Sequence, residues 1–86
     1  MTWLSPKEGQ GLKSLRTPQH QELLRRLISA RKKARLTQQA LADRLGRHQS
    51  FVAKYEAAER RLEVIEFVQI CRAIGARPDY LLRTLP

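Results

Sequence analysis

The chain has 86 residues and carries 17 lysines and arginines against eight aspartates and glutamates, a formal net charge of +9. This length leaves room for one small domain, and the hydrophobic fraction of 42% suffices for a modest core. The positive charge favours polyanions as partners, because basic groups near phosphates release condensed counterions.

The composition also excludes several classes of protein. Cys71 is the only cysteine and there are two histidines, which are too few ligands for a zinc site, so we expect Cys71 to be a small buried core residue. No apolar run approaches the roughly 18 residues of a membrane span, and no apolar stretch follows Lys7 and Lys13 as in a secretory signal. We therefore expect a cytoplasmic protein with no metal, no cofactor and no membrane partner.

Residues 1–16 contain proline and two glycines, and their apolar residues show no helical period. We expect a flexible N-terminal arm there and a folded domain over residues 17–86. Thr17 is suited to cap a helix, and Pro18 to occupy its first position. A helix over residues 18–34 is predicted from an apolar stripe. Its members are Leu23, Leu24, Leu27, Ile28 and Ala34.

Four shorter helices are expected after the first. One begins at Thr37 and stops at Gly46, a residue that favours helix C-termini. The next covers residues 48–58, a fourth covers residues 63–74, and the last begins at Pro78. The apolar residues at helical spacing in the fourth are Val64, Phe67, Val68, Cys71 and Ile74. With no strand pattern, the sequence predicts an all-α, five-helix domain.

The segment from Thr37 to Ala58 has the spacing of a helix-turn-helix. Two helices joined by few residues must pack at a steep angle, and the small Ala42 would let them approach closely. Leu41, Leu45 and Val52 would fill the wedge between them. Gly46 can take the positive φ angle that a sharp turn needs.

This pattern resembles the Cro/repressor-type (XRE-like, lambda-repressor-like) helix-turn-helix regulators. The resemblance covers about residues 23–82. The matching residues are Leu36-Thr37-Gln38, Leu41-Ala42, Leu45-Gly46, Val52, Tyr55-Glu56, Ala73-Ile74-Gly75 and Pro78-Asp79-Tyr80-Leu81-Leu82. It implies a lambda-repressor-like domain that places the helix over residues 48–58 in the major groove of double-stranded DNA, as a homodimer on a palindromic operator.

The resemblance implies base contacts at the start of that helix. Gln49 and Ser50 stand where family members read bases, and Lys54 lies one turn further on. The chemistry fits independently, since glutamine can bond adenine bidentately and lysine can reach guanine. Phe51 could touch a thymine methyl group or pack inside the domain.

Phosphate contacts are expected on both sides of the reading helix. Gln38 resembles the family's phosphate-clamping glutamine, and the helix N-terminus behind it offers main-chain N–H groups. Arg47, Arg60 and Arg61 flank the reading helix and either bind phosphates or remain solvated. His48 could contact phosphate or begin the helix.

Two further features follow from the resemblance. Arg31 and Glu56 correspond to an ion pair between the first and third helices, which would position the reading helix. The last helix often forms the symmetric contact of a dimer, which would place Pro78, Tyr80, Leu81 and Arg83 at the interface. Leu81 could equally belong to the core.

The sequence departs from the family at three positions. Ala58 stands where many relatives have glycine, which predicts a slightly longer reading helix. Arg35 replaces a common glycine in the first turn, and Ala53 replaces a frequent serine. None of these breaks the pattern, but they make the operator sequence unpredictable by analogy.

The sequence features bear on three classes of function. A transcription regulator, most simply a repressor acting without a ligand, agrees with the motif, the charge and a length that leaves no room for a sensor domain. The alternative is an antitoxin-like protein that binds a partner toxin, for which residues 1–16 could supply the contact. Co-purification of a second chain would distinguish the two. An enzyme is disfavoured, because the carboxylates are scattered and no catalytic set or Gly-rich phosphate loop is present.

Overall fold

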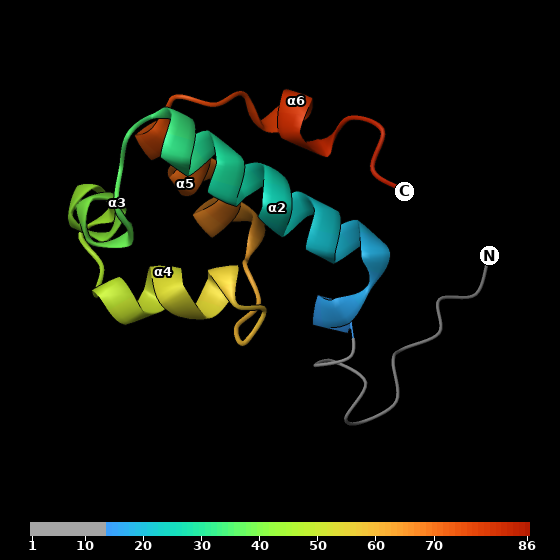
Figure 1. Cartoon of the computed structure of the whole chain (residues 1–86), viewed down its shortest axis with the longest axis horizontal. Helices are drawn as coiled ribbons and strands as arrows, with labels where there is room; N and C mark the ends of the chain where they lie inside the picture. The colour runs from blue at the N-terminus through green and yellow to red at the C-terminus, as the bar shows by residue number, and fades with distance from the viewer. Residues whose placement is uncertain (1–13) are drawn as a thin grey trace.

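The computed structural model describes residues 14–86, so most of the expected N-terminal arm lies outside the described residues. The described chain forms a short 3₁₀ helix, η1 (Ser14–Arg16), and five α-helices without strands (Figure 1). The α-helices are α2 (Pro18–Lys33), α3 (Gln38–Leu45), α4 (Gln49–Glu56), α5 (Val64–Ile74) and α6 (Pro78–Leu82). The prediction of an all-α, five-helix fold is confirmed.

The packed chain begins before Thr17, the boundary that the sequence predicts. Leu15 lies in η1, is buried, and η1 packs against α2. A leucine shows no periodicity within so short an element, so the helical pattern could not identify it as a core residue.

Capping residues determine where several of the helices begin and end. The Thr17 hydroxyl accepts a hydrogen bond from the His20 backbone N–H at 3.2 Å, and the Thr37 hydroxyl accepts one from Ala40 N–H at 3.0 Å. Each cap satisfies a donor that the first turn of a helix leaves without an intrahelical partner. Gly46 ends α3 with a φ of +64°, as the turn requires.

The reading helix is shorter than predicted. It ends at Glu56, Ala57 caps it, and Ala58 adopts a φ of +59°. Arg35 likewise takes a positive φ of +61° in the turn after α2. At both positions, where the resemblance leads us to expect glycine, a residue with a side chain adopts the left-handed conformation, so the turn strains the backbone and α4 is not lengthened.

A single core lies between the helices. It consists of Leu24, Leu27, Leu36, Leu41, Ala42, Phe51, Val52, Tyr55, Phe67, Ile70, Cys71, Ile74 and Leu81. Cys71 is fully buried, as expected. Val64 was expected on the core face of α5 but is 76% exposed, and Ile65 beside it is 66% exposed. Glu66 and Phe67 in the same turn are buried, so within residues 14–86 only one side of the first turn of α5 faces the core, and Val64 and Ile65 lie on the other side.

Helix α2 is the axis of the arrangement. It packs against α4, α5 and α6, while α3 packs on α4 and α5. Helix α6 lies on the side of α2 away from α4 (Figure 1). The structure thus has one face built from α3 and α4 and another built from α2 and α6. Among residues 14–86, no helix has both the length and the apolar character that a membrane crossing requires.

Candidate nucleic-acid interface

Helices α3 and α4 form a compact helix-turn-helix. Only residues 46–48 separate them, and the Arg47 backbone N–H donates to the Ala42 carbonyl at 2.9 Å to close the turn. Leu41, Ala42 and Val52 are fully buried, and Leu45 packs against the same core. The residues predicted to fill the wedge therefore do so, and they hold α4 at a defined angle.

Helix α4 has one buried face and one open face. Phe51, Val52 and Tyr55 point into the core. Ser50 is half-buried and Lys54, one turn later, is exposed, and both lie on the face of α4 that points away from the core. Gln49, also half-buried, begins the helix. The three polar residues predicted to read bases thus lie at the surface of α4.

A chain of hydrogen bonds connects the first of these residues to the interior. Arg31 Nε donates to Glu56 Oε2 at 2.7 Å, and Arg31 Nη2 donates to Glu56 Oε1 at 3.1 Å. Gln38 Nε2 donates to the same Oε1 at 2.8 Å, and Gln38 Oε1 accepts from Gln49 Nε2 at 2.8 Å. The predicted phosphate ligand Gln38 therefore also orients the predicted base reader Gln49.

The Arg31–Glu56 contact is deeply placed. The side chains of the two residues are 10% and 5% exposed, and Arg31 Nη1 also donates to the Leu36 carbonyl at 2.8 Å. Together with the Gln38–Glu56 hydrogen bond, these contacts join α2, the turn after it, α3 and the end of α4. The sequence predicted the pair but not its extension through Gln38 to Gln49, because that link depends on side-chain directions across two helices.

Phe51 packs inside the domain and does not face DNA. Its residue is 7% exposed, and its ring lies 5.5 Å from that of Tyr55. The guanidinium carbons of Arg47 and Arg60 cover the ring at 4.1 and 4.7 Å from its centroid. Of the two roles considered for Phe51, base contact is corrected to core packing, because the ring has no surface left for a thymine methyl group.

The two arginines over Phe51 share one carboxylate, that of Glu66 on α5. Arg60 donates to both Glu66 oxygens at 2.9 and 2.8 Å, and Arg47 Nη1 donates to Oε2 at 3.3 Å. Glu66 Oε1 also accepts from the Glu63 backbone N–H at 3.0 Å. The hydrogen bonds from Arg60, reinforced by the Glu63 N–H and Arg47, lower the pKa of Glu66 to about 2. We call Arg47, Arg60, Phe51 and Glu66 the rim cluster.

Glu66 is a residue that the sequence interpretation missed. The signal that could have found it is the spacing from Glu63, since an acidic N-cap followed three residues later by glutamate can form a capping box. The partners of the carboxylate come from the segments before and after α4, so only the folded chain brings them together.

The remaining predicted phosphate contacts are at the surface. His48 is exposed and caps α4, since its Nδ1 accepts from the Ser50 N–H at 3.4 Å and lies 3.2 Å from Ser50 Oγ. Arg61 is exposed, and its carbonyl accepts from Arg60 Nη1 at 2.7 Å. His48 therefore begins the helix, and a phosphate contact from either residue stays a prediction.

The residues predicted for a dimer interface divide into two groups. Leu81 is 5% exposed and belongs to the core, so its interface role is corrected. Tyr80 and Arg83 are exposed, Pro78 is half-buried, and the Arg83 guanidinium lies 5.7 Å from the Tyr80 ring centre. A five-residue helix must bury its one leucine to stay attached to the domain.

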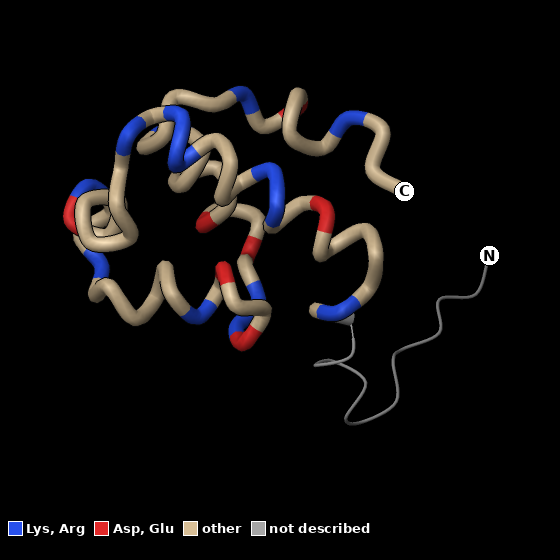
Figure 2. The backbone as a smooth tube through the Cα atoms, in the orientation of Figure 1, with Lys and Arg blue, Asp and Glu red and all other residues tan. Residues whose placement is uncertain are grey.

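Positive charge is not confined to α3 and α4. Lysines and arginines also mark α2 and the chain around α6, while several acidic residues gather near the end of α4 and the start of α5 and others lie on α2, α3 and α6 (Figure 2). Among residues 14–86, no three His, Cys, Asp or Glu side chains gather as a metal site would require.

Comparisons with known proteins agree with this geometry. Residues 27–81 match the family model described as helix-turn-helix. The structure is similar to that of an XRE-family like protein from Pseudomonas syringae pv. tomato str. DC3000, with 51% sequence identity and a TM-score of 0.78 over 90% of this chain and 94% of that chain. No curated protein matches the sequence. The chain therefore belongs to the XRE family of helix-turn-helix proteins, the DNA-binding transcription regulators that the sequence resembles.

Proposed function

We propose that this protein is a transcriptional repressor that reads operator DNA in the major groove with α4, as a homodimer on a palindromic site. The observation that carries the proposal is the orientation of Gln49 by Gln38, which is itself bonded to the buried Arg31–Glu56 pair. A base-reading side chain that is held in place before binding loses less conformational entropy on contact.

The open face of α4 supplies chemistry that suits base edges. The amide of Gln49 can bond adenine N6 and N7, and the ammonium of Lys54 can reach guanine O6 and N7. Ser50 accepts or donates and so tolerates several bases. Ala53 between them is small, which lets the helix approach the groove closely.

Backbone contacts would come from the elements that flank α4. The N-terminus of α3 and the exposed Arg61 and His48 are suited to phosphates, with Gln38 beside them. Arg47 and Arg60 would contribute less than free arginines, because Glu66 already neutralises part of their charge. The main electrostatic attraction is therefore the net charge of +9 of the whole chain.

Dimerisation follows from the small size of the reading element. One eight-residue helix makes few base contacts, and two copies on a two-fold site double them. Repression is the simplest consequence of such binding, since a bound dimer at a promoter excludes other proteins. The place of action would be the cytoplasm, on the nucleoid.

The test is selection of bound sequences from a random DNA library, followed by footprinting of the selected site. We expect two half-sites about 10–11 bp apart, or a multiple of that spacing. Gln49→Ala should cost about 1–3 kcal/mol, mainly at one base pair of each half-site, whereas Arg61→Ala should weaken binding to all DNA and reduce the salt slope by about one ion. A single asymmetric site, or equal losses on selected and random DNA for both variants, would contradict the proposal.

A further inference from the structure

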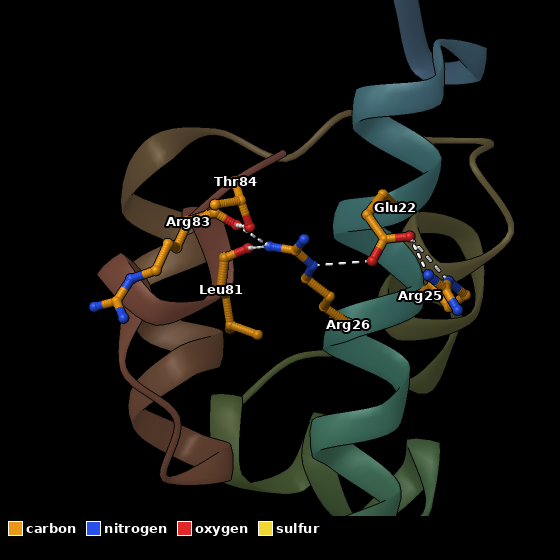
Figure 3. A network of polar contacts seen from close by, with 6 residues as sticks. All are labelled: Glu22, Arg25, Arg26, Leu81, Arg83 and Thr84. Atoms are coloured by element: carbon orange, nitrogen blue, oxygen red, sulfur yellow. Dashed lines mark hydrogen bonds and ion pairs between the residues drawn. The ribbon is translucent and has the colours of Figure 1, made fainter. Parts of the chain in front are cut away.

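One concave surface of the described chain lies away from α3 and α4. It is a groove of about 820 Å³ between α2 and α6, which we call the α2–α6 groove (Figure 3). Five cations and one carboxylate line it. They are Arg25, Arg26, Lys33, Arg77, Arg83 and Glu22. Because α6 lies on the side of α2 away from the reading helix (Figure 1), these side chains would not contact an operator bound by α4.

The groove is built around a fixed arginine. Arg26 Nη1 donates to the carbonyls of Leu81 and Arg83, at 3.0 and 2.5 Å, and Nε donates to Glu22 at 3.0 Å (Figure 3). The end of α6 is thereby tied to the first half of α2. A groove whose walls are held together in this way is present before any partner arrives, so binding costs little rearrangement.

Other cations of the groove keep their donors available. Lys33 has no side-chain partner within residues 14–86, and the Arg83 guanidinium contacts only the face of Tyr80 in that part of the chain. Arg77 pairs with Asp79 through side chains that are 77% and 57% exposed, a contact that water screens. Tyr80 itself is 66% exposed and offers an apolar wall beside these donors.

The charge of the groove decides between its possible occupants. A second copy of the chain would bring the same lining, five cations against Glu22 and a net charge of +4, to this face, which opposes the predicted dimer contact through Tyr80 and Arg83. Residues 1–13 hold two lysines and one glutamate, so this segment also lacks the net negative charge that would complement the groove. Double-stranded DNA is a wide rigid rod and suits a convex or flat surface better than a groove with apolar walls.

We propose that the α2–α6 groove binds an extended acidic segment of a partner protein. Its carboxylates would pair with Lys33, Arg77 and Arg83, and an apolar side chain would rest on Tyr80. This protein would then hold DNA on one face and a protein on the other.

The experiment is an NMR titration of the full chain, saturated with duplex DNA, with the peptide Glu-Glu-Leu-Glu-Glu-Leu, blocked at both ends. Saturating DNA occupies the other basic face and leaves the groove open. We expect amide shifts to concentrate at Lys33, Arg77, Tyr80 and Arg83, and the same peptide with glutamine in place of glutamate to bind at least tenfold more weakly. Shifts centred on α3 and α4 would overturn the proposal.

Charge-reversal variants separate the groove from general attraction. Lys33→Glu and Arg83→Glu should each weaken peptide binding about tenfold, while Arg72→Glu, the same charge change at an exposed position of α5, should weaken it less than twofold. Thermal unfolding of each variant checks that the fold is intact. Equal weakening by all three variants would overturn the proposal.

The DNA affinity of the groove variants distinguishes this proposal from the proposed function. A retained affinity for the selected operator, with lost peptide binding, supports a second face. A coupled loss of DNA affinity and of dimer mass in Arg83→Glu would show that this face joins two copies, which overturns the acidic-segment proposal and leaves DNA binding by α4 standing.

Discussion

Two carboxylates hold the reading helix, and they do so in different surroundings. Glu56, at the C-terminal end of α4, meets Arg31 where both side chains are at most 10% exposed. Glu66, on α5, is as well buried, but its partners Arg47 and Arg60 are 39% and 35% exposed. Both are guanidinium–carboxylate contacts, but water reaches the arginines bound to Glu66 more easily than it reaches Arg31.

This difference assigns different tasks to the two contacts. In the deep contact neither charge can return to water without opening the core, so both partners must remain paired. In the rim cluster the arginines can exchange Glu66 for water or for a phosphate at little cost. The deep pair thus fixes the position of α4, whereas the rim cluster joins the segments before and after α4 across Phe51.

The largest expected effect comes from removing the deep carboxylate. Glu56→Ala leaves the Arg31 charge buried without its partner and should lower the free energy of unfolding by roughly 3–5 kcal/mol. Urea unfolding followed by circular dichroism measures the loss. Glu66→Ala is the matched comparison and should cost about 1–2 kcal/mol, because water replaces the lost contacts of the two arginines. A larger loss for Glu66→Ala would contradict the comparison.

The contribution of the rim cluster to the free energy of unfolding should depend on pH. The pKa of Glu66 is lowered to about 2, first by the hydrogen bonds from Arg60. A carboxyl group whose pKa is lower in the folded than in the unfolded state stabilises the fold at pH values above its unfolded pKa. This stabilisation is lost as the pH falls through its folded pKa. The stability advantage of the native protein over Glu66→Gln should therefore be constant from pH 7 to about 5 and shrink between pH 4.5 and 2. Chemical unfolding at each pH measures it, and an undiminished advantage at pH 2 would exclude this role.

The link from the deep pair to the DNA face can be broken separately. Gln38→Ala removes the bond that orients Gln49 and should weaken binding to the selected operator about fivefold to tenfold, which is about 1 kcal/mol. Gln39→Ala is the control, since Gln39 lies next to it on α3 and its side chain bonds only Asp43, at 2.8 Å, among residues 14–86. Fluorescence anisotropy with operator and random duplexes gives both affinities. Equal effects of the two substitutions would show that the chain of bonds does not reach the DNA.

The smallest effect concerns the turn between the two contacts. Ala58 holds a φ of +59°, and Ala58→Gly should raise the free energy of unfolding by roughly 0.5–1 kcal/mol, because glycine adopts this conformation without strain. Ala57→Gly serves as the control, since its φ of −85° gives glycine no advantage. Thermal melts suffice to compare them. Stabilisation by both, or by neither, would mean that the turn stores no strain.

Sequence reasoning was reliable where a few adjacent residues decide the structure. The cap at Thr17, the start of a helix at Thr37, the stop at Gly46 and the buried wedge of Leu41 and Val52 all follow from local propensity and helical spacing. It was wrong about the length of α4, because the turn conformation of Ala58 is imposed by its surroundings and not by its own preference.

The sequence by itself thus determined the order of the helices, their ends apart from that of α4, the family and the open face of α4. Only the tertiary structure decided that Phe51 and Leu81 are core residues and that Glu66 binds two arginines. The physical reason is distance along the chain. A cap or a turn involves neighbours, whereas burial of a ring or the sharing of a carboxylate depends on how separate helices meet.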